Sequence, residues 1–149
     1  MQHGVLRQLA ADAGLERDPA LQLAFGLACV ERVRHLLEEP RALALLDALR
    51  GAVQAGAAVP PALAAEAAAV ARGHRGSPSL DGSGHSAVSA THALARALAG
   101  HALEAADYAA YAAVYAYGRY AVQDPASFEP EHAWQADCLR RLVQARQAA

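Results

Sequence analysis

The sequence predicts an all-α protein, a single-domain helical bundle of about six helices, and three observations support this. Alanine, leucine and arginine, which favour helices, dominate a chain of 149 residues that contains no lysine, isoleucine or asparagine. β-Branched residues are scarce, and no stretch shows the alternating pattern of a half-buried strand. Prolines and glycines divide the chain into segments that have the length of ordinary helices. A chain of 149 residues has the size of one domain, so residues 1–149 are expected to form a single domain.

The first two helices are expected at residues 2–15 and 19–38. Gly14 stands near the end of the first helix, where glycine commonly stops a helix. Asp18 is the predicted N-cap of the second helix, and Pro19 occupies its first turn. The buried face of this second helix is expected to carry Leu21, Phe25, Ala28, Cys29, Val33 and Leu36.

The next two helices are each expected to begin at a proline. Pro40 opens the third helix, which is predicted to end between Gly51 and Gly56. The Pro60-Pro61 pair opens the fourth, which ends at Gly73. A Gly/Ser-rich stretch then follows, and the segment from Gly73 to Ser86 is predicted to be an internal loop.

The last part of the chain is predicted to form one long helix and a final shorter one. The long, alanine- and tyrosine-rich helix is expected at residues 86–122, and Asp124-Pro125 ends it. The final helix begins around Pro130. It is expected to turn four side chains toward the core: Trp134, Leu139, Leu142 and Val143.

Charge and targeting signals narrow the class of protein. The net charge of -2 gives no basic field, so nucleic-acid binding is not expected, whereas a basic protein partner is compatible with it. Cys29 and Cys138 show no metal-site spacing and are interpreted as free thiols in a reducing compartment. With no signal peptide and no membrane-spanning apolar run, a soluble cytoplasmic protein without membrane partners is expected.

All five tyrosines fall within residues 108–120. Tyrosine has A/T-rich codons, and other residues encoded by such codons are nearly absent from the chain. The presence of five tyrosines in one segment therefore indicates that they have a role there. At 100° per residue, one narrow stripe of the expected long helix carries six polar or aromatic residues. These residues form the predicted partner-binding site: His101, Glu104, Tyr108, Tyr111, Tyr115 and Arg119.

The stripe has two interpretations. Tyrosine and arginine are common anchors of binding surfaces, so the stripe can be a recognition surface. Alternatively, its tyrosines are the bulky side chains that fill an alanine-rich core. Tyr117 and Tyr120 lie off the stripe and are predicted to pack inside the protein.

Three carboxylate-imidazole pairs at helical spacing raise the question of a metal site. The pairs are His101 with Glu104, Glu129 with His132, and Glu31 with His35. A carboxylate-bridged metal centre of a helical bundle needs two Glu-x-x-His helices and further inward carboxylates, whereas this chain has one such motif. No metal site is predicted, and surface ion pairs are the simpler interpretation.

Other catalytic motifs are missing from the sequence. The glycine-rich stretch lacks the phosphate-binding GxxxxGK[ST] pattern, and no serine or cysteine stands in a nucleophile-elbow motif. The arginines of the last helix, Arg140, Arg141 and Arg146, complement the helix dipole. No enzyme activity and no cofactor are expected.

Several segments together show a family resemblance: residues 23–39, the run ATHALARALAGHALEAADYAAYAA at 90–113, and AWQADCLRRL at 133–142. They resemble the alanine-rich, all-helical immunity proteins of bacterial polymorphic-toxin systems, the Imm-five-like group. The likeness covers roughly residues 19–142, and Tyr111 and Tyr115 depart from it where small residues are common. The resemblance depends mainly on three segments: Cys29-x-Glu31-Arg32-Val33, Gly100-His101 with Tyr108, and Trp134-Gln135.

The resemblance implies a nonenzymatic protein that binds a cognate toxin in the cytoplasm of the producing cell and blocks its active site. The alternatives are a structural or self-associating protein, in which the aromatic stripe forms a homodimer, and a metal-binding helical bundle enzyme.

Overall fold

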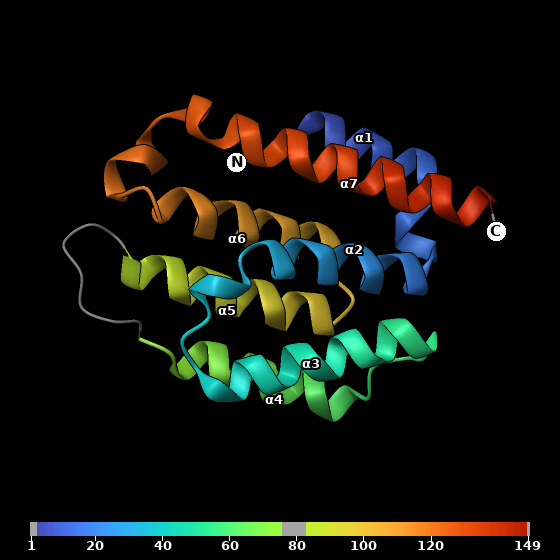
Figure 1. Cartoon of the computed structure of the whole chain (residues 1–149), viewed down its shortest axis with the longest axis horizontal. Helices are drawn as coiled ribbons and strands as arrows, with labels where there is room; N and C mark the ends of the chain where they lie inside the picture. The colour runs from blue at the N-terminus through green and yellow to red at the C-terminus, as the bar shows by residue number, and fades with distance from the viewer. Residues whose placement is uncertain (1–2, 76–82, 149) are drawn as a thin grey trace.

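The computed structural model describes residues 3–75 and 83–148, and seven α-helices make up most of this part (Figure 1). The described residues contain no strand, so the all-α prediction is confirmed. None of the described helices is long and apolar enough to cross a membrane. The helices are α1 (Gly4–Ala13), α2 (Pro19–Arg32), α3 (Pro40–Ala55), α4 (Pro61–Gly73), α5 (Ser83–Leu98), α6 (Ala102–Tyr115) and α7 (Glu129–Ala148).

The helices lie roughly side by side, and the first and last are neighbours (Figure 1). α1 packs along α7, while α3 and α4 lie together on the opposite side of the molecule. Between them α2 contacts both α5 and α6. Four short 3-10 turns join helices: η1 (Leu15–Arg17), η2 (Arg34–Leu36), η3 (Arg119–Gln123) and η4 (Pro125–Phe128).

The predicted starts of α2, α3 and α4 are confirmed, as are the glycine stop signals of α1 and α3. The Asp18 carboxylate accepts a hydrogen bond from the Leu21 amide at 3.1 Å, which caps α2. Pro40 and Pro61 each open a helix, and Gly56 follows the last residue of α3. The bounds differ in α2, which ends at Arg32 rather than near residue 38 because η2 tightens the chain there.

The long helix expected at residues 86–122 is wrong, because Gly100 divides it into α5 and α6. Gly100 has φ +82°, a left-handed conformation that glycine adopts without a Cβ clash. The His101 amide donates to the Arg96 carbonyl at 2.9 Å, and the Gly100 amide donates to Ala97 at 3.1 Å, as in a Schellman helix end. The chain reverses there, so α5 and α6 form an antiparallel hairpin.

The loop predicted from Gly73 to Ser86 is also shorter than expected. α4 extends to Gly73, and α5 already begins at Ser83, so the end of the predicted loop is helical. Residues 76–82 of that prediction lie outside the described residues. α7 begins at Glu129, one residue before the predicted start.

Small side chains allow the central helices to approach closely. A Cβ added to Gly26 of α2 would lie 3.0 Å from the Cβ and 3.2 Å from the Cα of Ala97 in α5. The α5–α6 hairpin likewise buries alanines of both helices, including Ala93, Ala97 and Ala105. The larger core side chains match the prediction in most positions: Leu21, Phe25, Cys29, Val33 and Leu139 are buried, while Ala28, Leu36, Trp134, Leu142 and Val143 are partly buried.

Candidate partner-binding surface

The predicted stripe runs along α6, and α5 covers one side of it. The Tyr108 ring stacks on His92 of α5, with centroids 5.2 Å apart and planes inclined by 21°. The Tyr115 and His85 rings are tilted rather than stacked, with centroids 5.3 Å apart and planes inclined by 32°. Both pairs are symmetric about the turn at Gly100, since their members stand eight and fifteen residues before and after it. The hairpin register therefore places an imidazole beside each of these two tyrosines.

The polar end of the stripe lies near this turn. Arg96 approaches the Tyr108 ring at 5.9 Å, and its Nη1 lies 3.7 Å from Glu104 Oε1. The His101 Nδ1 lies 3.6 Å from the other Glu104 oxygen. More than half of the His101 and Glu104 side-chain surface is exposed, so water screens these contacts and they add little stability.

Tyr111 packs in the opposite direction, against the segment that leads into α7. Its ring meets Phe128 edge to face, with centroids 5.1 Å apart and planes at 76°. Phe128 belongs to a small buried cluster with Ala110, Val114 and Ala121. Tyr108, Tyr111 and Tyr115 are all half-buried. Each ring therefore packs on a neighbouring ring and also contributes to the surface. The stripe is thus partly a packing element and partly a surface, so each of the two interpretations applies to part of it.

Arg119 does not lie on the helix that the sequence predicted. α6 ends at Tyr115, and Gly118, with φ +129° and ψ +157°, turns the chain before Arg119 begins η3. Arg119 nevertheless reaches the stripe, because its Nη2 lies 3.4 Å from Nε2 of His85, the residue beside Tyr115. Four of the six predicted site residues thus belong to α6, His101 is the N-cap of that helix, and Arg119 joins them from η3.

The prediction that Tyr117 and Tyr120 pack inside the protein is wrong. They are 72% and 76% exposed, and they are the only exposed tyrosine, phenylalanine or tryptophan side chains in the described part of the chain. The sequence argument assumed a continuous helix, whereas α6 has already ended before Tyr117. Residues 117–120 are called the tyrosine turn below.

Hydrogen bonds and a small buried cluster hold the tyrosine turn in place. The Gly118 amide donates to the Tyr115 carbonyl at 2.9 Å, and the Ala121 amide donates to the Gly118 carbonyl at 3.1 Å. Gly118 itself is buried, and Ala121 packs with Phe128. The orange segment between α6 and α7 carries this turn at one end of the bundle (Figure 1). Its two rings are thus presented to solvent from an anchored backbone.

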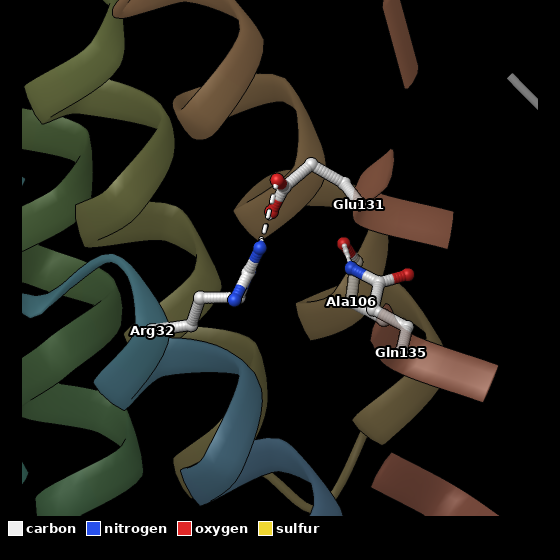
Figure 2. Close-up of polar contacts among 4 residues, drawn as sticks. All are labelled: Arg32, Ala106, Glu131 and Gln135. Atoms are coloured by element: carbon white, nitrogen blue, oxygen red, sulfur yellow. Dashed lines mark hydrogen bonds and ion pairs between the residues drawn. The ribbon is translucent and has the colours of Figure 1, made fainter. Parts of the chain in front are cut away.

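A polar cluster ties α7 to α2 and α6 (Figure 2). Arg32 donates two hydrogen bonds to the carboxylate of Glu131, from Nε to Oε1 at 2.8 Å and from Nη2 to Oε2 at 3.2 Å. The Gln135 amide, 3% exposed, donates to the Ala106 carbonyl at 2.8 Å. The Arg32 guanidinium also lies over the Trp134 ring, 4.5 Å from its centroid.

The ion pair also favours the charged form of its arginine. Hydrogen bonding to Glu131 is the main factor that raises the pKa of Arg32; burial lowers it, and the charge of Glu131 raises it further. Because Arg32 already has a carboxylate partner, it acts here as a support for α7.

In each of the other two carboxylate-imidazole pairs, one member contacts a residue outside the pair. The His132 ring stacks on His3 at 4.3 Å, and its carbonyl accepts a hydrogen bond from His3 Nε2 at 2.8 Å. Glu31 binds Arg50, with 2.7 Å between Oε1 and Nε. Among residues 3–75 and 83–148, no group of three or more His, Cys, Asp or Glu side chains could hold a metal ion.

A hollow lies away from the tyrosine turn, where α2 begins and α3 and α5 end. It has a volume of about 530 Å³, and its lining includes Leu23, Val53, Val59 and Leu98. Its one carboxylate, Asp18, is bound to Arg146 at 2.7 Å. The lining of this hollow is therefore mainly apolar, and its one carboxylate is already bound to an arginine.

Two parts of this surface were missed by sequence reasoning. His85 and His92 are named by no local pattern, because they meet the tyrosines only through the hairpin register. The exposure of Tyr117 and Tyr120 had one usable signal, Gly118 directly after Tyr117. Comparisons of the chain with protein-family models, curated proteins and solved structures find no match.

Proposed function

We propose that this chain is an immunity protein that binds a cognate bacterial toxin in the cytoplasm of the producing cell and occludes the toxin's active site. The observation that carries the proposal is the pair of tyrosines, Tyr117 and Tyr120, held 72% and 76% exposed on the tyrosine turn. The resemblance of the sequence to all-helical immunity proteins supplies the class of partner.

Exposed aromatic rings on a fixed backbone suit a binding hot spot. Tyrosine has only two side-chain torsions, so its ring gains contact area for a small loss of conformational entropy. Burying a large apolar side chain contributes about 1.5–3 kcal/mol, and two such rings can raise an affinity by about 100-fold or more. Arg119 stands between them in the sequence, and tyrosine and arginine are the residues most enriched in hot spots.

The half-buried stripe extends this surface along α6. Tyr115 is linked to Arg119 through His85, and Tyr111 lies 6.4 Å from Tyr115. Tyr108, Glu104 and His101 continue the line toward the turn at Gly100. In this proposal the tyrosine turn is the centre of the interface, and the stripe is its less exposed flank.

Coexpression with the product of the neighbouring gene tests the proposal. The wild-type protein should copurify with that product and protect cells from it, whereas the double variant Tyr117→Ala/Tyr120→Ala should lose both properties while keeping its helical circular dichroism. Val5→Ser is the matched control, because Val5 of α1 is 54% exposed and lies outside the proposed surface.

Two results would count against the proposal. If the wild-type protein neither binds nor protects against any toxin encoded beside it, the immunity function is excluded. If it forms a dimer in solution that the double variant abolishes, the tyrosine turn serves self-association instead.

A further inference from the structure

Arg119 has no carboxylate partner among the described residues. Seven other arginines pair with an aspartate or glutamate within 4 Å, whereas the one polar neighbour of Arg119 is His85 Nε2 at 3.4 Å. Some exposed arginines elsewhere are also unpaired, such as Arg17. Arg119 differs from them because it lies between two exposed aromatic residues, Tyr117 and Tyr120.

Carboxylates near the tyrosine turn are engaged elsewhere. The Asp124 carboxylate accepts a hydrogen bond from the Ala126 amide at 3.0 Å, at the start of η4. Glu131 is bound to Arg32. Glu129 stands in the first turn of α7, where the helix dipole stabilises a negative charge. Among the described residues, no carboxylate therefore neutralises the charge of Arg119.

The contact with His85 leaves most of the guanidinium free to bind. A neutral imidazole with its proton on Nδ1 can accept one hydrogen bond from Arg119 through Nε2. The guanidinium has five N–H donors, and its planar fork matches a carboxylate with two parallel hydrogen bonds. Tyr117 and Tyr120 flank Arg119 in the sequence and are exposed. Rings that cover such an ion pair in a complex would exclude water from it and strengthen it.

The geometry points to a partner that places an aspartate or glutamate side chain on Arg119, which has Tyr117 and Tyr120 as exposed neighbours on the tyrosine turn. The partner is a protein with an acidic contact segment, although the chain as a whole carries a net charge of -2. This inference rests on the proposed function for the identity of the partner, but the carboxylate chemistry can be tested without that partner.

A library of random twelve-residue peptides displayed on phage provides the first test. Peptides are selected on the wild-type protein and counter-selected on the Tyr117→Ala/Tyr120→Ala variant. Selected peptides should be enriched in aspartate or glutamate, and replacing the key acid with its amide should weaken binding at least tenfold. Arg119→Gln should weaken it to the same extent and Arg119→Lys less, because lysine lacks the bidentate fork. Arg17→Gln, on η1, is the matched control and should have no effect.

Several outcomes would overturn the inference. Failure to enrich any peptide, a neutral or basic consensus, or acidic peptides that bind Arg119→Gln as tightly would each do so. Binding of a labelled single-stranded 20-nucleotide DNA that depends on Arg119 would show that the turn recognises phosphates instead.

The same variants separate this inference from the proposed function. If acidic peptides bind through Arg119 but the neighbouring gene product does not, the inference holds and the immunity function fails. If the gene product binds equally well to Arg119→Gln and to the wild type, the immunity function holds and the carboxylate contact is excluded.

Discussion

His92 of α5 stacks on Tyr108 of α6, and this contact fixes the register of the hairpin that carries the candidate surface. Two helical turns farther from Gly100, His85 and Tyr115 form a second pair, tilted by 32° with centroids 5.3 Å apart. Because residues seven apart return to nearly the same helix face, both tyrosines face the same helix. The hairpin thus uses one side of each ring for packing and leaves an edge available to solvent.

The first prediction concerns the energy of this ring pair. Tyr108→Ala should lower the free energy of unfolding by about 1–3 kcal/mol, because a half-buried ring loses its packing. In a double-mutant cycle with His92→Ala, a coupling of about 0.5–1.5 kcal/mol is expected for a stacked pair. Urea denaturation measures both quantities.

Tyr120→Ala is the matched control for that cycle. Its ring is exposed, so the change in stability should stay within about 0.5 kcal/mol. Strict additivity of the Tyr108 and His92 substitutions would show that the rings are not in contact and would refute the register.

The second prediction concerns the close approach of α2 and α5. Gly26→Ala would force a Cβ to within 3.0 Å of Ala97 and push the two backbones apart. The resulting strain, about 1–3 kcal/mol, should exceed the gain of about 1 kcal/mol in helix propensity. We therefore expect a lower midpoint of urea denaturation.

Gly51→Ala offers the opposite expectation within the same protein. Gly51 lies inside α3, and nothing lies within 4 Å of an added Cβ. This variant should be more stable than the wild type by about 0.5–1 kcal/mol. Equal stabilisation by both substitutions would contradict the close α2–α5 contact.

Comparison of these glycines also shows why the fold was only partly predictable. Helix starts at Asp18-Pro19, Pro40 and Pro61 depend on local chemistry, so the sequence predicts them well. Gly26 and Gly51 lie inside helices, whereas Gly100 ends one. The choice between these outcomes depends on tertiary packing, which a single-sequence pattern does not contain.

In the candidate surface, too, the features that depend on local sequence were predicted, whereas those that depend on tertiary packing were not. The spacing from His101 to Tyr115 is a property of one helix, and the structure keeps these residues on α6 or at its N-cap. The positions of Arg119, Tyr117 and Tyr120 depend on where α6 ends, so the assumption of a continuous helix misplaced them. His85 is recruited by the hairpin alone.

The third prediction concerns the ion pair between α2 and α7. Glu131→Ala should destabilise the protein by about 1–3 kcal/mol, since it removes two hydrogen bonds to Arg32 and leaves a partly buried guanidinium unpaired. Glu66→Ala removes a similar fork with Arg41, but that pair is exposed. Its effect should stay below about 1 kcal/mol. Thermal or urea denaturation of both variants tests the contrast, and a larger loss for Glu66→Ala would contradict it.

The fourth prediction concerns acid sensitivity. Burial is the main factor that lowers the pKa of His92 and of His132, and nearby positive charges lower it further: Arg96 and His74 for the first, His3 and the N-terminus for the second. The unfolded chain therefore binds more protons than the native protein as the pH falls through about 6.5, the usual histidine value.

The sign of the effect follows from this difference in proton binding. The native state gains stability from the two neutral imidazoles above about pH 6.5 and loses it progressively as the pH drops below that value. Asp107 has a raised pKa, caused mainly by burial, so it acts in the opposite sense at more acidic pH. Measurements between pH 7 and 5 span the usual pKa of histidine. There, the free energy of unfolding should fall for the wild type and fall less for His92→Gln and His132→Gln. A steeper decline in either variant would contradict the lowered pKa of that histidine.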